Sequence, residues 1–323
     1  MSRVAVTGAN GFIGSQVVRE LLRRGREVVA LAGRDVDDAN LHGVPVKARE
    51  LDLLDPASVR AGLAGCDSVI HTAACYAFWL PDPRDFYRVN VDGTRHVLDA
   101  ARELGLHRMV YTSTGATLSP AGPGFPGHYR ESKAQGERLV LEAAAQGFPA
   151  VVVHPTTVLG PGDRRPTPTG TLIVHFLARR MKAFLEMQQN VVHVEDVAAG
   201  HVLALERGAP GEHYVLGGEN LSMRALLELL AEITGIPAPR FALPNSLVLA
   251  LGVANEWLSD HVTHRPPLVA REAALHARDA RFFDTSKSQR ELGFAARGAR
   301  ETLADAVRWF ATDRAQPIRS NPV

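Results

Sequence analysis

The chain has 323 residues, 46% hydrophobic and 22% charged, a balance that excludes a disordered protein and is typical of a globular one. Its net charge of +1 gives no overall reason to expect a nucleic-acid partner. The two cysteines lack disulfide or metal-ligand spacing, and no apolar run approaches the roughly 20 residues that span a bilayer. We therefore expect a cytoplasmic protein without membrane insertion or a metal site.

The first half of the chain alternates short β-rich runs with helical patterns. The predicted strands cover residues 4–6, 28–32, 46–51, 68–71, 108–113 and 150–154. The predicted helices cover residues 12–24, 56–64, 84–104 and 128–147. Strands separated by helices imply right-handed crossovers, so the expected fold class is α/β, a Rossmann doubly wound parallel sheet with helices on both faces.

The pattern changes after Pro155. Proline and glycine cluster at residues 155–170, and helices then dominate, with isolated strands predicted near residues 191–194 and 214–216. We therefore expect a dinucleotide-binding domain at residues 1–155, to which residues 188–217 return. The remainder of residues 156–323 is predicted to form a smaller, mostly helical lobe that binds the substrate.

A glycine-rich turn joins the first strand to the first helix, with the sequence Thr7-Gly8-Ala9-Asn10-Gly11-Phe12-Ile13-Gly14. Glycines there allow a tight turn, a close approach of the backbone to a pyrophosphate and close packing of the helix on the strand. The helix N-terminus directs unpaired N–H groups at the phosphates. The turn therefore predicts a dinucleotide site that includes Gly8, Asn10, Gly11, Phe12, Ile13 and Gly14.

The end of the second strand bears on which dinucleotide is bound. A carboxylate there would bind the ribose hydroxyls of NAD, but the sequence reads Leu31-Ala32-Gly33-Arg34. Arg34 could pair with a 2′-phosphate, although Asp35 beside it could neutralise it. This pattern favours NADP over NAD. Asp52, after the third strand, is placed either to meet the adenine edge or to cap the helix that starts near Pro56.

Tyr129 and Lys133 lie one turn apart on the same face of a predicted helix. A free phenol has a pKa of about 10, and a nearby ammonium group would lower it towards the working range of a proton shuttle. Thr114 and Ser113 follow the preceding strand at the edge where ligands bind in open parallel sheets. Thr114 would orient the substrate oxygen, with Ser113 as support, while Thr112 is expected only to satisfy backbone groups.

The motifs together resemble the extended short-chain dehydrogenase/reductases, also called the NAD-dependent epimerase/dehydratase family. The similarity covers nearly the whole chain, and within the family it is strongest to dihydroflavonol-reductase-like proteins and hopanoid-associated sugar epimerases. It rests on Thr7-Gly8-x-x-Gly11-x-x-Gly14, Asp52-Leu53, His71-Thr72-Ala73-Ala74, Asn90-Val91-x-Gly93-Thr94, Tyr129-x-x-x-Lys133 and His193-Val194-x-Asp196-Val197-Ala198.

This resemblance implies roles for several residues. Thr114, Tyr129 and Lys133 would form the catalytic triad, and the lysine would also reach the cofactor ribose. The cofactor would be lined, besides the glycine turn, by Asp52, Leu53, Ala73, Ala74, Pro155, Thr157 and Val158. Asn90 would lie near the lysine, although its simpler interpretation is a helix N-cap. Relatives also suggest a homodimer through the helices at residues 84–104 and 128–147.

Two departures from the family bear on function. The segment at residues 118–127 is shorter than the loop that relatives carry before the tyrosine, which would widen the mouth of the site. Thr114-Gly115-Ala116 lacks the Asp-Glu pair that follows the threonine in sugar dehydratases. Cys75, Phe78 and Trp79 are expected to line an apolar substrate pocket, although the two aromatic residues could equally pack between lobes.

Three functions remain open on the sequence. The first is reduction by NAD(P)H of a carbonyl on a small, fairly hydrophobic molecule, with Tyr129 as proton donor. The second is epimerisation of a nucleotide sugar with tightly bound NAD, for which Arg164, Arg165 and Arg281 could hold a diphosphate. The third is a dinucleotide-sensing protein without chemistry, against which the triad residues argue.

Overall fold

The computed structural model describes residues 2–33, 38–119, 127–267 and 270–313. Its central feature is a seven-stranded sheet with the order β10-β6-β5-β4-β1-β2-β3, in which every neighbouring pair is parallel. The strands are β1 (Arg3–Thr7), β2 (Glu27–Ala32), β3 (Arg49–Glu50), β4 (Ser68–His71), β5 (Arg108–Thr112), β6 (Ala150–Pro155) and β10 (His213–Leu216). The Rossmann fold class predicted from the sequence is confirmed.

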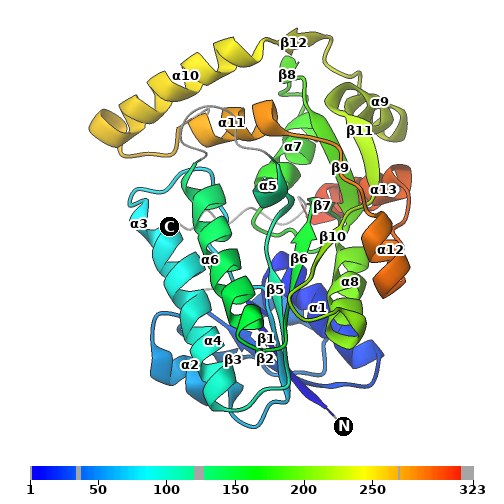
Figure 1. The fold of residues 1–323 in the computed structure, drawn as a ribbon. Helices are drawn as coiled ribbons and strands as arrows, with labels where there is room; N and C mark the ends of the chain where they lie inside the picture. Colours follow the sequence, from blue (N-terminus) through cyan, green and yellow to red (C-terminus); the bar gives the residue numbers. More distant parts are fainter. Residues whose placement is uncertain (1, 34–37, 120–126, 268–269, 314–323) are drawn as a thin grey trace.

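Helices cover both faces of this sheet (Figure 1). One face carries α1 (Phe12–Arg23) and α8 (Val194–Arg207), with α12 (Ser286–Leu292) against α8 and β10. The other face carries α2 (Pro56–Leu63), α4 (Gly93–Glu103) and α6 (His128–Ala145). Strand residues alternate between the two cores, as Val4 and Val6 do on one side and Ala5 does on the other.

The predicted elements of the first half differ from the structure in two places. The third strand was expected at residues 46–51, but only Arg49 and Glu50 pair with β2, and both side chains are exposed. This strand lies at the sheet edge, where only one neighbour holds it. The predicted helix at residues 84–104 comprises α3 (Arg84–Tyr87), a π-helical turn at Arg88–Asp92 and α4.

The rest of the chain forms a smaller lobe at the carboxyl ends of the strands (Figure 1). A three-stranded sheet contains β7 (Thr157–Leu159), β9 (Gln188–His193) and β11 (Glu219–Ser222), and a second pair joins β8 (Ala183–Leu185) to β12 (Phe241–Leu243). The helices are α7 (Pro168–Leu177), α9 (Met223–Thr234), α10 (Asn245–Leu258), α11 (Arg271–Asp279) and α13 (Ala299–Asp313), with the short α5 (Gly115–Leu118) below them. The lobe is mostly helical, as expected.

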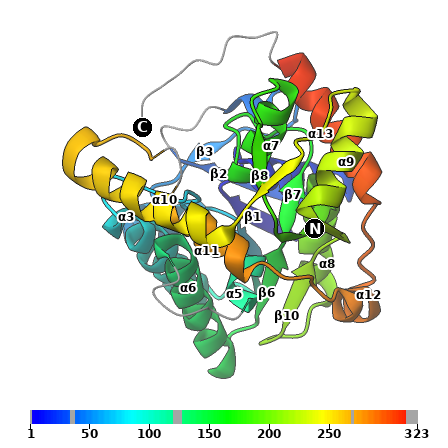
Figure 2. The same ribbon diagram turned by 90° about the horizontal axis from the view of Figure 1, so that it is seen from above.

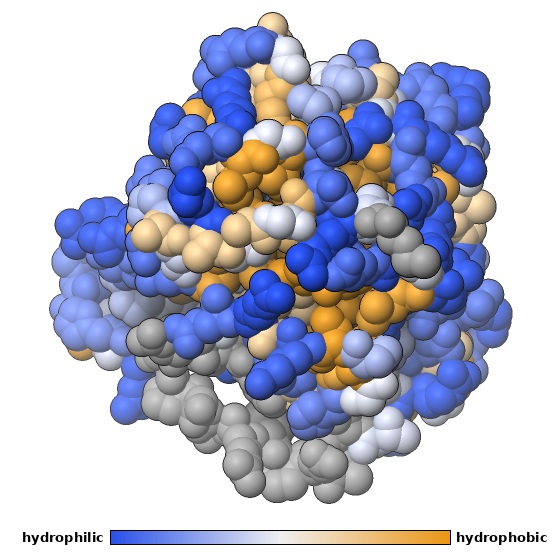
Figure 3. Space-filling model, turned by 90° about the horizontal axis from the view of Figure 1, so that it is seen from below, coloured by the Kyte–Doolittle hydropathy of each residue, from blue (hydrophilic) through white to orange (hydrophobic). Residues whose placement is uncertain are grey.

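Two segments of the later chain return to the large sheet, since β10 pairs with β6 and α8 packs on α1. Seen from above, α10 and α11 lie side by side over the end of α6 (Figure 2). The face seen from below is largely hydrophilic, with apolar residues gathered near its middle (Figure 3). No helix among the described residues is both long and apolar enough to cross a membrane.

Candidate active site

The glycine turn occupies the point where the strand order reverses, between β1 and its neighbours β2 and β4. Gly8 has a φ of +67°, and a Cβ on it would lie 2.9 Å from the Ala73 backbone. A Cβ on Gly14 would lie 2.1 Å from the carbonyl oxygen of Gly8. Side chains are therefore excluded on steric grounds, which leaves the backbone open to a ligand at the helix N-terminus.

The other residues predicted around the cofactor are distributed along the same edge. Asn10 is buried within the turn, and Phe12 and Ile13 begin α1. Ala73 and Ala74 follow β4 directly. Arg34, on which the preference for NADP depends, lies outside the described residues.

Asp52 does not cap the helix that follows it. Its carboxylate accepts a hydrogen bond from Leu54 N at 2.9 Å, whereas Asp55 caps α2 through Ala57 N at 3.0 Å. The capping alternative is therefore wrong, and Asp52 remains available at the exposed end of the sheet. The neighbouring Leu53 packs closely on Gly93 at the start of α4. A Cβ added to Gly93 would lie only 3.2 Å from the Cβ of Leu53.

Lys133 is almost fully buried on α6. Its Nζ donates to the carbonyl oxygen of Thr112 at 2.7 Å and lies 4.4 Å from the centre of the Tyr111 ring. Burial lowers the pKa of the amine to about 7, while the carboxylate of Glu137 opposes this shift. The ammonium group is thus held at the end of β5 by a carbonyl and an aromatic face.

Tyr129 lies one turn before Lys133 and is also buried. Burial raises the pKa of its phenol well above the ordinary value, and a hydrogen bond with the Thr114 side chain acts in the opposite direction. The sequence predicted that the lysine lowers this pKa, but in the structure burial raises it and Lys133 is not among the groups that shift it. The phenol is therefore protonated at neutral pH. Its ring contacts Tyr76, with ring centres 4.9 Å apart.

Thr114 and Ser113 follow β5 as predicted, but they have different surroundings. Thr114 caps α5 by accepting from Ala116 N at 3.3 Å, and its side chain faces the pocket described below. Ser113 donates to Glu137 at 2.6 Å and does not face that pocket. Thr112 bonds the ring of His201 at 2.8 Å rather than a backbone group, so that expectation was wrong.

Glu137 is a residue that the sequence analysis missed. Its carboxylate accepts from Ser113 and from Thr117, the latter at 3.0 Å, and lies 3.7 Å from the fully buried ring of His154. Its position four residues after Lys133 on α6 was the available signal, because residues at that spacing share a helix face. His154 in turn lies 3.1 Å from the carbonyl oxygen of Thr114.

Asn90 lies in the π-helical turn and is not an N-cap, so that alternative is wrong. Its side chain accepts from Cys75 N at 2.8 Å, and donates to Cys75 O at 3.1 Å and to Ser132 at 2.9 Å. The extra residue of the π turn directs this amide into the space between the chain after β4 and the helix that carries Lys133. Asn90 therefore fixes the backbone at Cys75.

A cavity of about 270 Å³ contains the side chains of Thr114 and Tyr129 in its wall. Tyr76 and Phe78 close one side, and α11 provides Ala273, His276 and Ala277. Most other lining groups are apolar or uncharged: Leu172, Leu185, Met187, Met223, Phe283, Gln188, Gln189 and Asn190. The charged residues in the wall are Arg130, Asp279 and Arg281, of which the first two form an ion pair at 3.2 Å.

The three predicted pocket residues separate in space. Phe78 lines this cavity, whereas Cys75 does not. Trp79 lines a second cavity of about 290 Å³ and donates from its indole to Asp260 at 2.9 Å. Pro155 ends β6, and Thr157 begins β7 and lines the first cavity. Val158, also in β7, packs against the core.

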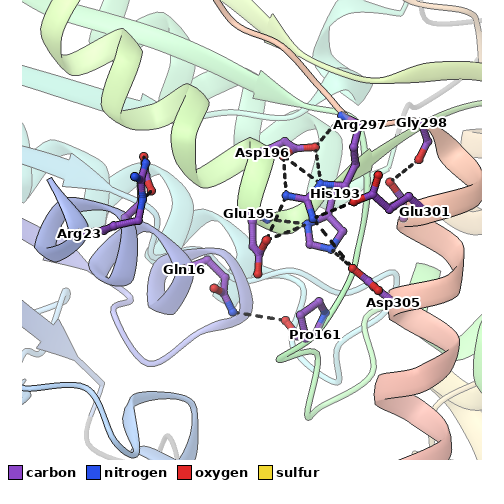
Figure 4. Close-up of polar contacts among 12 residues, drawn as sticks. Gln16, Arg23, Pro161, His193, Glu195, Asp196, Arg297, Gly298, Glu301 and Asp305 are labelled. Carbon is purple, nitrogen blue, oxygen red and sulfur yellow. Dashed lines mark hydrogen bonds and ion pairs between the residues drawn. The ribbon is translucent and has the colours of Figure 1, made fainter.

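The motif around His193 connects segments that are distant in the sequence (Figure 4). The His193 ring caps α8 by accepting from Glu195 N at 3.1 Å, and its other nitrogen lies 3.5 Å from Asp305 on α13. Arg297, before α13, forms hydrogen bonds to Asp196 at 2.8–3.1 Å. This cluster attaches α13 to α8 and has a structural role.

Comparisons with known proteins agree with this arrangement. The pattern of the NAD dependent epimerase/dehydratase family matches residues 4–217. A Synechocystis relative, named provisionally as a dihydroflavonol 4-reductase, is 38% identical over 94% of this chain and 93% of its own. A Methylococcus capsulatus relative named sterol demethylase protein B is 35% identical over 94% of this chain and 97% of its own.

Solved structures show the same fold. The crystal structure of a protein called gox2253 is 37% identical, with a TM-score of 0.84 over 97% of this chain and 98% of that one. A nucleoside-diphosphate-sugar epimerase from Pseudomonas aeruginosa is 26% identical, with a TM-score of 0.78 over 97% and 98% of the two chains. With the glycine turn at the reversal of a parallel sheet, these matches establish that the chain belongs to the NAD dependent epimerase/dehydratase family.

Proposed function

We propose that this protein reduces a ketone or similar carbonyl on a small, fairly hydrophobic molecule with NAD(P)H, and that Tyr129 donates the proton. The observation that supports this most directly is the cavity in which a protonated phenol and the hydroxyl of Thr114 meet largely apolar walls. A polar pair in an apolar pocket fits a substrate with one reacting oxygen and a hydrocarbon body.

The residues of the turn fit a nicotinamide dinucleotide. Gly8 and Gly14 leave no room for side chains, so the pyrophosphate would meet backbone N–H groups and the start of α1. Lys133 would bind the ribose hydroxyls from its position at the end of β5. When bound, the cofactor supplies the hydride that adds to the carbonyl carbon. NADP is favoured over NAD by the absent acid at the end of β2 and by Arg34.

Two side chains would orient the substrate and transfer the proton. Thr114 would donate to the substrate oxygen and hold it near the phenol, and Tyr129 would then protonate that oxygen as it gains negative charge. The phenol is protonated at neutral pH and so can donate, but its raised pKa makes it a weak acid that would need a positive charge nearby to release the proton. The positive charge of Lys133 near the end of β5 would stabilise the phenolate that remains.

Names of relatives agree with a carbonyl substrate. Besides the dihydroflavonol 4-reductase named above, a Stigmatella aurantiaca relative is a ketoreductase of a farnesylated quinoline oxide, 33% identical over 95% of this chain. A Stenotrophomonas maltophilia relative is named 2-alkyl-3-oxoalkanoate reductase and is 28% identical over 90% of the chain. These named substrates combine a carbonyl with a ring or alkyl chain, as the apolar cavity would require.

A nucleotide-sugar epimerase is the second candidate. It is favoured by the similarity to the Pseudomonas epimerase and to MoeE5 solved with UDP-glucuronic acid and NAD, 25% identical. Arg281 in the cavity wall could hold a phosphate. Arg164 lies 5.7 Å from the ring centre of Trp309, and neither it nor Arg165 lines the cavity. Of the two arginines in the described cavity wall, Arg130 is paired with Asp279, which leaves Arg281 to bind a phosphate. One arginine is a weak site for a diphosphate, so the reductase has the stronger case.

Turnover separates the candidates. The protein is incubated with NADPH or NADH and a panel of hydrophobic ketones, and the nicotinamide absorbance is followed. Stoichiometric loss of absorbance with alcohol formation is expected. Interconversion of nucleotide sugars without net cofactor consumption would instead establish the epimerase, and full activity of Tyr129→Phe in every assay would favour a sensing protein or another proton donor.

We also propose a homodimer that forms through α4 and α6, the helices on one outer face of the sheet. Two such pairs would make a four-helix contact. A dimer mass by light scattering at micromolar concentration is the expected result, and a monomer mass would contradict it.

A further inference from the structure

The first turn of α6, which carries Tyr129, is capped from the other lobe. The residue at the N-cap position is Gly127, which has no side chain to bind the free N–H groups of the turn. Glu272 on α11 supplies the missing oxygens. Its carboxylate accepts from Tyr129 N at 3.3 Å and from Arg130 N at 3.1 Å.

The sequence leaves room for this carboxylate by placing glycine at the cap. A Cβ on Gly127 would lie 2.3 Å from Cδ of Glu272, and its φ of +101° also disfavours other residues. Glu272 is 7% exposed, so the charge is withdrawn from water and depends on these N–H groups. The cap therefore depends on two residues 145 positions apart: Gly127, which leaves the space, and Glu272, which fills it.

The same helix α11 forms a wall of the substrate cavity through Ala273, His276 and Ala277. A second link joins it to α6, because Arg130 pairs with Asp279 at the end of α11 and also bonds the carbonyl oxygen of Ser119. The cavity wall and the first turn of α6 are thus held together at both ends of α11. Any displacement of α11 by a ligand would act on the backbone of Tyr129.

We propose that Glu272 is a positioning residue for Tyr129: its carboxylate fixes the first turn of α6 from the substrate lobe, so that the cavity wall and the proton donor move as one unit. This inference rests on the proposed role of Tyr129 as proton donor. Glu272 does not touch the substrate cavity; it lines the second cavity behind Phe78.

The charge of Glu272 adds an electrostatic effect. A carboxylate at a helix N-terminus is stabilised by the helix dipole, but it also opposes formation of a phenolate nearby. Burial raises the pKa of Glu272 to about 7, against the lowering effect of the backbone hydrogen bonds. The other ionisable groups that line its cavity are Glu256, Asp260, His128, His264 and Arg271.

The first test measures the cap without any turnover. The backbone amide signals of Tyr129 and Arg130 are followed by NMR from pH 5 to pH 9 in the wild type and in Glu272→Gln. Both amide protons should shift together with a midpoint near pH 7 in the wild type, because ionisation strengthens the acceptor. That transition should be absent in Glu272→Gln, where only the smaller shift from the neighbouring His128, at lower pH, should remain. Amide signals that titrate identically in both proteins would overturn the proposal.

The second test asks whether the cap positions the reactive group. With a ketone substrate, Glu272→Gln is expected to lower kcat about tenfold and Glu272→Ala about a hundredfold, since small misplacements of a catalytic group are costly. The control is Glu256→Gln, which keeps an oxygen to accept from Arg271 N, bonded at 3.0 Å, but removes a negative charge that raises the pKa of Glu272. It should keep kcat near that of the wild type and move the midpoint of the amide titration to lower pH.

These outcomes distinguish two kinds of failure. If Tyr129→Phe remains active, the proposed function is wrong, but the amide titration still tests whether Glu272 caps α6. If kcat of both Glu272 variants stays within twofold of the wild type while Tyr129→Phe is inactive, the positioning role is refuted. Loss of folding in both variants by circular dichroism would show that Glu272 is a structural residue and would equally refute it.

Discussion

The glycine turn and the cavity open on the same edge of the sheet, but the turn is formed by backbone and the cavity by side chains. The turn is a run of eight consecutive residues with a closely packed backbone, in which a Cβ on Gly14 would lie 2.1 Å from Gly8 O. The cavity is lined by residues that are far apart in sequence, from Tyr76 to Phe283. The turn should therefore tolerate almost no change, and the cavity should tolerate changes that alter substrate preference.

Tyr129 lies in the cavity wall, and its replacement should have the largest effect. Tyr129→Phe removes the proton donor and is expected to lower kcat by about 10²- to 10⁴-fold, with little change in cofactor affinity. Steady-state kinetics and calorimetric titration of NADPH measure the two quantities. Tyr87→Phe is the control, because the Tyr87 hydroxyl lies 3.2 Å from the His128 ring and Tyr87 does not line the cavity. Equal losses in both variants would place the proton donor elsewhere.

Gly14→Ala should break the turn. The added methyl would overlap backbone atoms that cannot move away, so we expect about 1–3 kcal/mol lower stability and at least a tenfold weaker NADPH affinity. Urea unfolding and calorimetry are the measurements. Gly25→Ala is the control: its φ is +71° but nothing lies within 4 Å, so stability should fall while NADPH affinity is kept. An unchanged affinity in Gly14→Ala would mean that the dinucleotide binds elsewhere.

Lys133 is buried at a cost in stability. Its pKa falls from 10.5 to about 7 on folding, so between these values the unfolded chain binds the extra proton and the folded protein gains stability as pH rises. Lys133→Met should therefore raise the free energy of unfolding at pH 6 by as much as about 5 kcal/mol, which corresponds to a fall of the pKa from 10.5 to about 7. That gain should shrink towards pH 10. Urea unfolding without cofactor tests this, and a gain independent of pH would exclude burial of the charge as its cause.

The cavity should respond most mildly. Leu172→Ala removes part of an apolar wall and should raise KM for a hydrophobic ketone about tenfold with kcat nearly unchanged, since the wall binds substrate and transition state alike. Leu177→Ala is the control on the same helix, because Leu177 packs in the core of the lobe and does not line the cavity. A fall in kcat alone would show that Leu172 positions reacting groups.

The difference between the two regions also explains what could be predicted. The sheet, the helices on its faces and the glycine turn follow from local patterns of apolar residues and glycines. Glu137 was within reach of the same reasoning, since it lies on the Lys133 face of α6. The exposed edge strand β3 and the π-helical turn at Asn90 differ from the prediction because neighbouring segments decide them.

The sequence by itself determined the Rossmann fold, the glycine turn and the place of Tyr129 one helical turn before Lys133, because each depends on residues a few positions apart. Only the tertiary structure decided which side chains surround the phenol and that burial raises its pKa. It also decided that Glu272 caps the helix start next to a glycine 145 positions earlier. Such contacts depend on how the two lobes pack, and no local pattern of the chain encodes that packing.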